Sequence, residues 1–428
     1  MEGSHGPCGG GNRRRFLKTA AAAGAALAST DALRGAPPAT QAKAVVPTVT
    51  LGKTGQKVTK LGMGTSWALS PSFVQAALFS GVRYIDTSES YENTKAEKVI
   101  GEVLDRTGMR KDIYLVTKNS KGHATGDAAV KVYEERLDES LARLKTDYAD
   151  CYYIHGISTR EIDMLRDPGV KAAFEHLKKV NKIRFCGLSC HDPILPEILE
   201  LAAEVGWIDQ VMIKYNYRDV GKKERYDDLN RAIDKASKAN IGLVAMKTQS
   251  GAEAFPADKA ALEAKGIKAP AGGFQPREKA IVDLLEKGYK REVAAIKTVW
   301  MDPRMQVVVS EMTNFSDLRE NVAASQEPLT TTEMRLLEQY RETTAHLYCH
   351  GCGHLCESAA KGVPVATVLR YLRYYEVYGK RQEARALYQA LPPVARDLAA
   401  ADLLAAESAC PHGLPVVDLV RRADRQMA

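Results

Sequence analysis

The chain has 428 residues, of which 45% are hydrophobic and 26% are charged, and its formal net charge is +7. This length suits a barrel-sized domain with an appendage, and the composition is that of a globular chain rather than a disordered one. The charge is too modest to indicate a nucleic-acid partner, and no uninterrupted apolar run is long enough to span a bilayer as an integral segment of the mature chain.

The first 44 residues are expected to form a signal peptide and linker outside the fold. Residues 13–18 read RRRFLK and precede a short, Ala-rich apolar stretch at 19–28. This order, in which basic residues precede an apolar stretch that ends in small residues suited to signal-peptidase cleavage, resembles a twin-arginine export signal. It implies the twin-arginine export machinery as a partner and a periplasmic or other extracytoplasmic location. A basic, helix-prone amino-terminal arm is the alternative interpretation.

Residues 45–328 alternate short β-rich runs with amphipathic stretches. Expected strands are residues 61–65, 82–86, 113–118, 149–155, 183–189, 210–215, 243–247 and 307–309. Expected helices include residues 96–104, 129–144, 170–180, 195–203 and 226–239. Eight such βα units predict an α/β fold, a closed (β/α)8 TIM-type barrel, with an open doubly wound sheet as the alternative. One connection, at 247–277, is rich in Gly and Pro and is expected to be either a lid or a plain insertion.

Four polar residues stand at or just beyond the ends of expected strands: Asp86, Tyr91, Lys118 and His155. Because the carboxyl ends of barrel strands share one face, these side chains are expected to meet there. A nearby cation favours tyrosinate, so Lys118, held by Asp86, is expected to lower the pKa of Tyr91. Tyr91 would then act as a general acid or base, while His155 orients a carbonyl oxygen. Taken singly, each residue also has an ordinary explanation, such as a strand-end cap or a satisfied core histidine.

Sequence motifs surround these four residues. They are LGMGT at 61–65, YIDTSESY at 84–91 followed by Glu97 and Gly101, VTK at 116–118, and YYIH at 152–155. With them, the stretch from 47 to about 325 resembles the aldo-keto reductases. These are (β/α)8 enzymes that exchange hydride between a nicotinamide cofactor and a small-molecule carbonyl or alcohol. The resemblance implies that Asp86, Tyr91, Lys118 and His155 form the catalytic tetrad of that family.

The same resemblance implies positions for the cofactor. Ser189 and His191 would lie near the carboxamide, Gln210 near the same ring face, and the segment from Ser310 to Asn321 would receive the adenine-side phosphate. Glu311 and Asp317 stand where many relatives carry a basic residue for the extra phosphate of NADP. NAD is therefore expected over NADP, since like charge repels that phosphate. The seventh strand also ends AMKT at 245–248, without the aromatic residue that commonly stacks on nicotinamide.

Residues 329–428 are expected to form a small, all-α cysteine-cluster domain. Cys349, Cys352, Cys356 and Cys410 are spaced CHGCGHLC and then Cys-Pro. This spacing predicts a four-cysteine iron-sulfur site, with zinc as the alternative metal and disulfides as the alternative chemistry. The segment resembles the ferredoxin-like tail of iron-sulfur aldo-keto reductases, which implies one 4Fe-4S cluster. An aromatic helical face at 368–378 is expected to pack by the cluster or against another helix.

Together these features predict an exported oxidoreductase with Tyr91 as general acid or base, an iron-sulfur cluster as second redox centre, and a redox partner protein. The alternative is an electron-transfer or binding subunit on a barrel that no longer transfers hydride. Glu311, Asp317 and the missing aromatic residue favour that alternative.

Overall fold

A computed structural model of the protein describes residues 46–67, 69–120, 123–220, 227–249, 290–344, 348–376 and 378–428. The expected signal segment at 1–44 and most of the expected lid or insertion at 247–277 lie outside these residues. Residues 43–428 form one compact unit. The expected domain boundary at 328/329 therefore stays a prediction.

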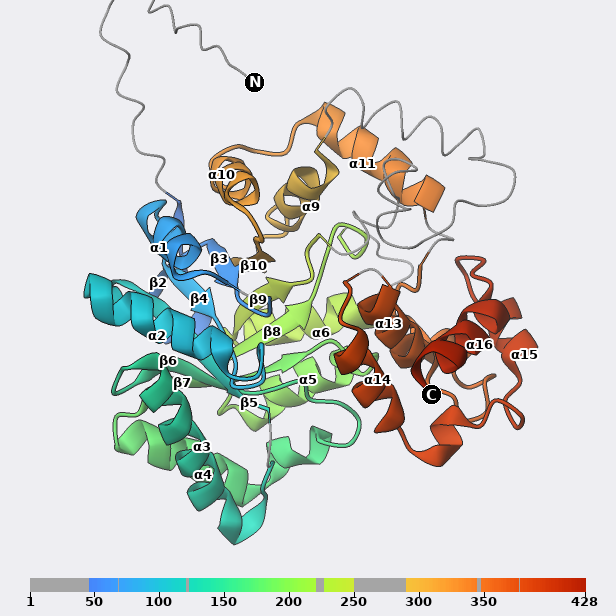
Figure 1. Ribbon diagram of the computed structural model, residues 1–428, viewed down its shortest axis with the longest axis horizontal. Helices are drawn as coiled ribbons and strands as arrows, with labels where there is room; N and C mark the ends of the chain where they lie inside the picture. Colours follow the sequence, from blue (N-terminus) through green and yellow to red (C-terminus); the bar gives the residue numbers. More distant parts are fainter. Residues whose placement is uncertain are drawn as a thin grey trace, which may run out of the picture. The chain divides into compact units, whose positions relative to one another are not determined.

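Eight parallel strands close into a barrel in the order β10-β3-β4-β5-β6-β7-β8-β9 (Figure 1). The strands are β3 (Leu61–Gly64), β4 (Tyr84–Asp86), β5 (Tyr114–Asn119), β6 (Ala149–Ile154), β7 (Ile183–Cys190), β8 (Gln210–Lys214), β9 (Gly242–Met246) and β10 (Val307–Glu311). All eight expected strands are present, so the prediction of a closed (β/α)8 barrel is confirmed and the open sheet is wrong.

Helices cover the outside of the barrel, and all of them except α10, which follows the last strand, lie between successive strands. They are α1 (Pro71–Phe79), α2 (Lys95–Thr107), α3 (Ala129–Leu144), α4 (Pro168–Lys179), α5 (Leu195–Val205), α6 (Asp227–Lys238), α9 (Arg291–Val299) and α10 (Phe315–Ala324). Short 3-10 turns lie at η1 (Gly52–Thr54), η2 (Met109–Asp112), η3 (Gly126–Ala128), η4 (Ile162–Arg166) and η6 (Pro393–Arg396). In α3, Tyr133, Leu137, Leu141 and Leu144 are buried, as their spacing at steps of three and four predicts.

A small hairpin precedes the barrel, formed by the antiparallel strands β1 (Thr48–Thr50) and β2 (Lys57–Thr59). Leu51 and Val58 of this hairpin pack with the inward-facing residues of the barrel strands, among them Tyr84, Tyr114 and Tyr153. The hairpin therefore covers apolar residues inside the barrel. Strands of only three residues carry too short an alternating pattern to be predicted from the sequence.

The carboxyl-terminal segment is entirely helical where it is described. It contains α11 (Thr331–Thr344), α12 (Gly353–Cys356), α13 (Val365–Glu376), α14 (Arg381–Gln389), α15 (Leu403–Ser408) and α16 (Val416–Met427). Figure 1 shows α13 to α16 as a group in orange-red to red. They share a hydrophobic core that includes Leu369, Tyr388, Val420 and Cys356. In the part of the chain that the structure describes, no helix is long and apolar enough to cross a membrane.

Candidate active site

The four predicted catalytic side chains come together at the carboxyl ends of the barrel strands. Asp86 ends β4, Lys118 lies in β5, and Tyr91 and His155 follow β4 and β6. Lys118 Nζ lies 2.6 Å from Asp86 Oδ1 and donates to the Tyr91 hydroxyl at 3.2 Å. The Tyr91 and His155 rings meet edge to face with centroids 5.6 Å apart. The strand ends thus bring together all four residues that the sequence suggested.

Asp86 and Lys118 form a buried ion pair. Their side chains are 4% and 1% exposed, and Lys118 Nζ also donates to the Thr87 carbonyl at 2.7 Å. Burial raises the pKa of Asp86 and lowers the pKa of Lys118, while the attraction between the two charges opposes both shifts. Each partner therefore depends on the other to stay charged.

The pKa of Tyr91 is raised well above its usual value, contrary to the expectation from Lys118. Burial is the largest cause, and the negative charges of Asp86 and Glu311 add to it. The expected lowering of the Tyr91 pKa is wrong because the loss of water around the hydroxyl outweighs the cation beside it. Tyr91 is consequently protonated at neutral pH, the form that can donate a proton.

His155 is held by hydroxyl groups that the sequence analysis did not single out. Its Nδ1 lies 3.2 Å from Ser88 Oγ and also contacts Ser120 Oγ. Burial lowers the pKa of His155 well below its usual value, and the positive charge of Lys118 adds to this shift. The imidazole is therefore neutral. The signal for Ser88 was present in the DTSESY motif, two residues after Asp86.

The residues implied for the nicotinamide end of the cofactor lie on or next to β7 and β8. Ser189 and His191 lie at the end of β7, where Ser189 Oγ accepts from the Gly156 N-H at 2.9 Å. Gln210 begins β8 inside the barrel, donates to the Tyr153 hydroxyl at 2.6 Å and accepts from the Tyr114 hydroxyl at 3.0 Å. The amide of Gln210 is thus satisfied by tyrosines within the barrel.

The residues implied for the phosphate end lie on β10 and α10. Asn321 Nδ2 donates to Ser310 Oγ at 2.9 Å. Asp317 accepts from the Thr313 N-H at 3.2 Å at the start of α10. Glu311 instead contacts Ser66 and raises the pKa of Tyr91, so it lies near the catalytic tetrad. The expectation that Glu311 faces an adenine-side phosphate therefore loses its structural basis.

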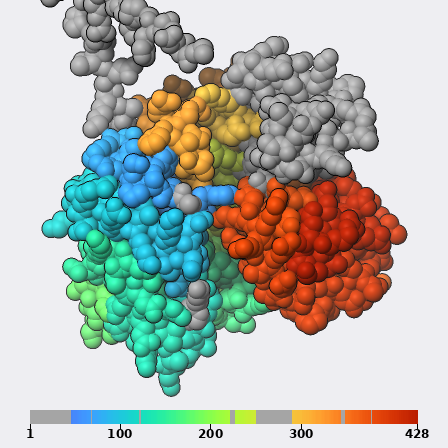
Figure 2. All heavy atoms as spheres, in the orientation of Figure 1, coloured from blue at the N-terminus to red at the C-terminus, as the bar shows by residue number. Residues whose placement is uncertain are grey.

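The carboxyl-terminal helices cover the end of the barrel that carries the tetrad. Lys247, just after β9, donates to the Tyr374 hydroxyl on α13 at 3.1 Å, and Lys214 of β8 donates to the His350 carbonyl. Figure 2 shows the orange-red and red atoms of these helices packed against the barrel. The aromatic face at 368–378 packs against the tail core through Tyr371, Tyr374 and Tyr375, as expected for packing against other helices, and Tyr374 also reaches Lys247 of the barrel.

The four tail cysteines belong to one region of the tail core. Cys356 is buried in it, Cys349 and Cys410 pack against it, and Cys352 is close enough to Cys349 and Cys356 to influence the pKa of both. Burial raises the pKa of Cys349 to about 11 and that of Cys356 to about 12, and neighbouring thiols contribute to both shifts. The described residues, which include all four cysteines, contain no group of three side chains placed to hold a metal ion. Cys349, Cys352, Cys356 and Cys410 are thiols that form no disulfide within this described part of the chain.

Comparison with known proteins decides the family. The family model described as the aldo/keto reductase family matches residues 61–342. The chain belongs to the aldo/keto reductase family. As a member of this family the protein is an oxidoreductase enzyme, which disfavours the alternative of a non-catalytic subunit. The match ends before Cys349, so the tail cysteines lie outside it.

Two curated relatives match over most of their own length, and a third matches over a shorter stretch. An uncharacterized oxidoreductase, YqkF of Bacillus subtilis, is 25% identical over 65% of this chain and 90% of its own length. L-galactose dehydrogenase of Arabidopsis thaliana is 25% identical over 69% of this chain and 92% of its own. Methylglyoxal reductase YeaE of Escherichia coli is 37% identical over a shorter stretch, 27% of this chain and 37% of its own.

Solved aldo/keto reductases share the barrel. The holo form of AKR11C1 from Bacillus halodurans aligns with a TM-score of 0.52 at 21% identity, covering 72% of this chain and 99% of its own. An aldo/keto reductase from Klebsiella pneumoniae in complex with NADP and acetate aligns with a TM-score of 0.50 at 22% identity. The alignment covers 68% of this chain and 94% of that protein. At these identities the likeness shows the shared fold.

Proposed function

We propose that the protein reduces a carbonyl, or oxidises the corresponding alcohol, with Tyr91 as the proton donor or acceptor. The observation that carries this proposal is Lys118 Nζ, which lies between the Asp86 carboxylate and the Tyr91 hydroxyl. Tyr91 keeps its proton at neutral pH because its pKa is raised, so it can protonate a carbonyl oxygen. His155, which is neutral, orients that oxygen by a hydrogen bond.

The proposed hydride carrier is a nicotinamide cofactor, which supplies the hydride when bound. The nicotinamide end of this cofactor would be held by Ser189 and His191 at the end of β7. Its adenine-side phosphate would be held by Ser310 of β10 and Asn321 of α10. The argument for NAD over NADP has weakened, since Glu311 contacts Ser66 rather than the start of α10. The Klebsiella pneumoniae relative is in complex with NADP. NADP is therefore the form that we propose to test first.

Titration of the purified full chain with NADPH and NADH tests this proposal, with binding followed by nicotinamide fluorescence. We expect saturable binding of NADPH and oxidation of the bound cofactor on addition of a small aldehyde or ketone. Asp317→Asn removes a negative charge at the start of α10 and should tighten NADPH more than NADH. If neither cofactor binds to metal-replete protein, the proposed hydride chemistry is wrong.

We further propose that Cys349, Cys352, Cys356 and Cys410 hold one 4Fe-4S cluster, which supplies one-electron redox chemistry when bound. The donor set supports this, since thiolates are the ligands of such clusters and these thiols influence each other's pKa. The Gly351 N-H already lies 3.4 Å from Cys349 Sγ. A cluster at these residues would lie beside the barrel mouth, where a redox partner protein could exchange electrons with it.

Anaerobic purification tests the cluster. We expect about four iron and four sulfide per chain, and visible absorption that bleaches with dithionite. Cys352→Ser should lose both, while Cys190→Ser, in β7, should keep them. Bound zinc without visible absorption would contradict the proposal.

Mass spectrometry of the same preparation tests the proposed twin-arginine export and periplasmic location, because export predicts a chain shortened near residue 28 or 44.

A further inference from the structure

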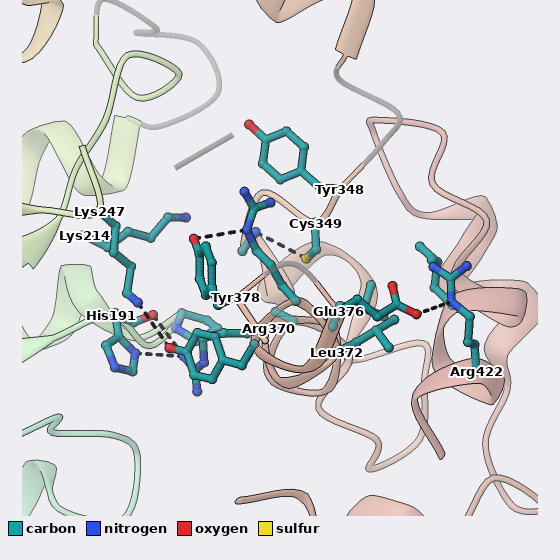
Figure 3. A pocket seen from close by; sticks show the side chains of 17 residues that line it. His191, Lys214, Lys247, Tyr348, Cys349, Arg370, Leu372, Glu376, Tyr378 and Arg422 are labelled. Atoms are coloured by element: carbon teal, nitrogen blue, oxygen red, sulfur yellow. Dashed lines mark hydrogen bonds and ion pairs between the residues drawn. The ribbon is translucent and has the colours of Figure 1, made fainter. Parts of the chain in front are cut away.

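A cavity of about 150 Å³ lies between the barrel and helix α13. Figure 3 shows His191, Lys214 and Lys247 approaching it from the barrel, and Tyr348, Cys349 and Arg370 from the tail. Lys247 has a backbone φ of 57°, in the left-handed region that a residue with a side chain rarely adopts. The cavity is thus built from two parts of the chain that are far apart in sequence.

Positive charge dominates the wall of this cavity. Five cationic side chains line it, namely Lys214, Lys247, Arg370, Arg373 and Arg422. The single carboxylate in the lining, Glu376, already pairs with Arg422 at 3.2 Å. His191 adds no charge at neutral pH, because burial lowers its pKa well below the usual value. The described lining therefore carries a clear excess of positive charge.

Three of these cations retain donors for a ligand. Arg370 uses one terminal nitrogen on His191, at 2.9 Å from Nδ1, and its buried Nε has no hydrogen-bond partner. Within the described chain, Lys247 donates to the Tyr374 hydroxyl and Lys214 to the His350 carbonyl. Among the described residues, no carboxylate lies within ion-pair distance of these three cations. Asp192 acts on Arg370, Glu311 on Lys247 and Asp219 on Lys214 only at longer range. Because five cations line the cavity and its single carboxylate is already paired, an anion would be attracted there.

We propose that this cavity binds a small organic carboxylate, held by Arg370, Lys247 and Lys214. A guanidinium binds the two oxygens of a carboxylate in one plane, and a cavity of about this size holds a molecule such as benzene. A dinucleotide phosphate is far larger. The tyrosine rings of Tyr348, Tyr374 and Tyr378 offer apolar surface to the remainder of the molecule.

The cavity adjoins the catalytic tetrad. Lys247 follows β9 and His191 follows β7, so both stand at the carboxyl ends of barrel strands, the face that carries the tetrad. A short molecule held by its carboxylate at Lys247 would lie at the strand ends that also carry Tyr91 and His155. The substrate class is therefore a carbonyl compound that carries a carboxylate, such as a 2-oxo acid. This last step rests on the proposed function of Tyr91, whereas the binding of the carboxylate does not.

Calorimetric titration of the full chain with benzoate and with its neutral isostere benzamide tests the inference without nicotinamide or turnover. We expect benzoate to bind at least tenfold more tightly than benzamide. Lys247→Met and Arg370→Gln should each weaken benzoate at least tenfold and leave benzamide unchanged. Because Arg370 also contacts His191, Lys214→Met provides a third variant on a separate strand. Arg385→Gln on α14, which does not line the cavity, is the matched control.

The outcomes separate the two proposals. Equal binding of benzoate and benzamide, or benzoate binding that survives all three substitutions, would overturn the carboxylate site even if neutral ketones are reduced. Selective benzoate binding without any carbonyl reduction would support the site and contradict the proposed function. A KM for phenylglyoxylate at least tenfold below that for its methyl ester would support both the carboxylate site and the proposed function. This difference in KM should disappear in Lys247→Met.

Discussion

Replacing Tyr91 with phenylalanine is expected to lower kcat for carbonyl reduction by about 10²- to 10⁴-fold, the usual contribution of a positioned general acid. The Tyr91 hydroxyl lies 3.2 Å from Lys118 Nζ and keeps its proton, because burial raises its pKa. The substitution removes this proton and leaves the ring in place. Steady-state reduction of a small aldehyde by the purified full chain measures the effect, and cofactor binding should be unchanged.

Tyr133→Phe is the matched control for this prediction. Tyr133 is fully buried in α3, and its hydroxyl has no hydrogen-bond partner within the described chain. Its loss should leave kcat unaltered. The pH profile gives a second check, because the pKa of His155 lies well below 6.5 and that of Tyr91 well above 10. Wild-type turnover should therefore stay level as the pH falls through 6.5. Unchanged turnover in Tyr91→Phe would contradict the assigned role.

The barrel and its tetrad could be predicted from the sequence for a physical reason. Parallel strands that are covered on both faces appear in the sequence as short apolar runs. The run around Val116 ends at Lys118, and the run around Ile154 ends just before His155. Because all strands point the same way, residues at their carboxyl ends share one face. The prediction that four scattered residues meet needed only this topology, and no knowledge of contacts.

Long-range contacts and the extent of burial could not be predicted from the sequence. Gln210 bonds to Tyr114 and Tyr153, whose inward direction depends on the barrel register. The contact of Arg370 with His191 joins residues 179 positions apart. The sign of the Tyr91 pKa shift depends on how much water is lost around the hydroxyl, which a motif does not reveal. These contacts decide which residues of the barrel remain available to a ligand.

Lys118→Met is expected to lower the free energy of unfolding by about 3–5 kcal/mol, the usual cost of breaking a buried ion pair by removing one partner. The Asp86 carboxylate would remain buried, with its cation gone from a distance of 2.6 Å. Urea unfolding followed by circular dichroism measures the loss. Lys145→Met is the control, because the Lys145–Asp105 pair has side chains that are 51% and 61% exposed. Such an exposed pair contributes about 0–1 kcal/mol.

The double variant Asp86→Asn/Lys118→Met separates charge from packing. If the unpaired carboxylate causes the loss, the neutral amide that replaces it should restore much of the stability, while turnover stays low without Lys118 beside Tyr91. The pH dependence has a defined sign. In Lys118→Met the buried Asp86 has a raised pKa, so lowering the pH protonates it and removes the unpaired charge. The stability deficit should therefore be largest at neutral pH and shrink on acidification. A deficit that is independent of pH and persists in the double variant would indicate a packing defect in place of an unpaired charge.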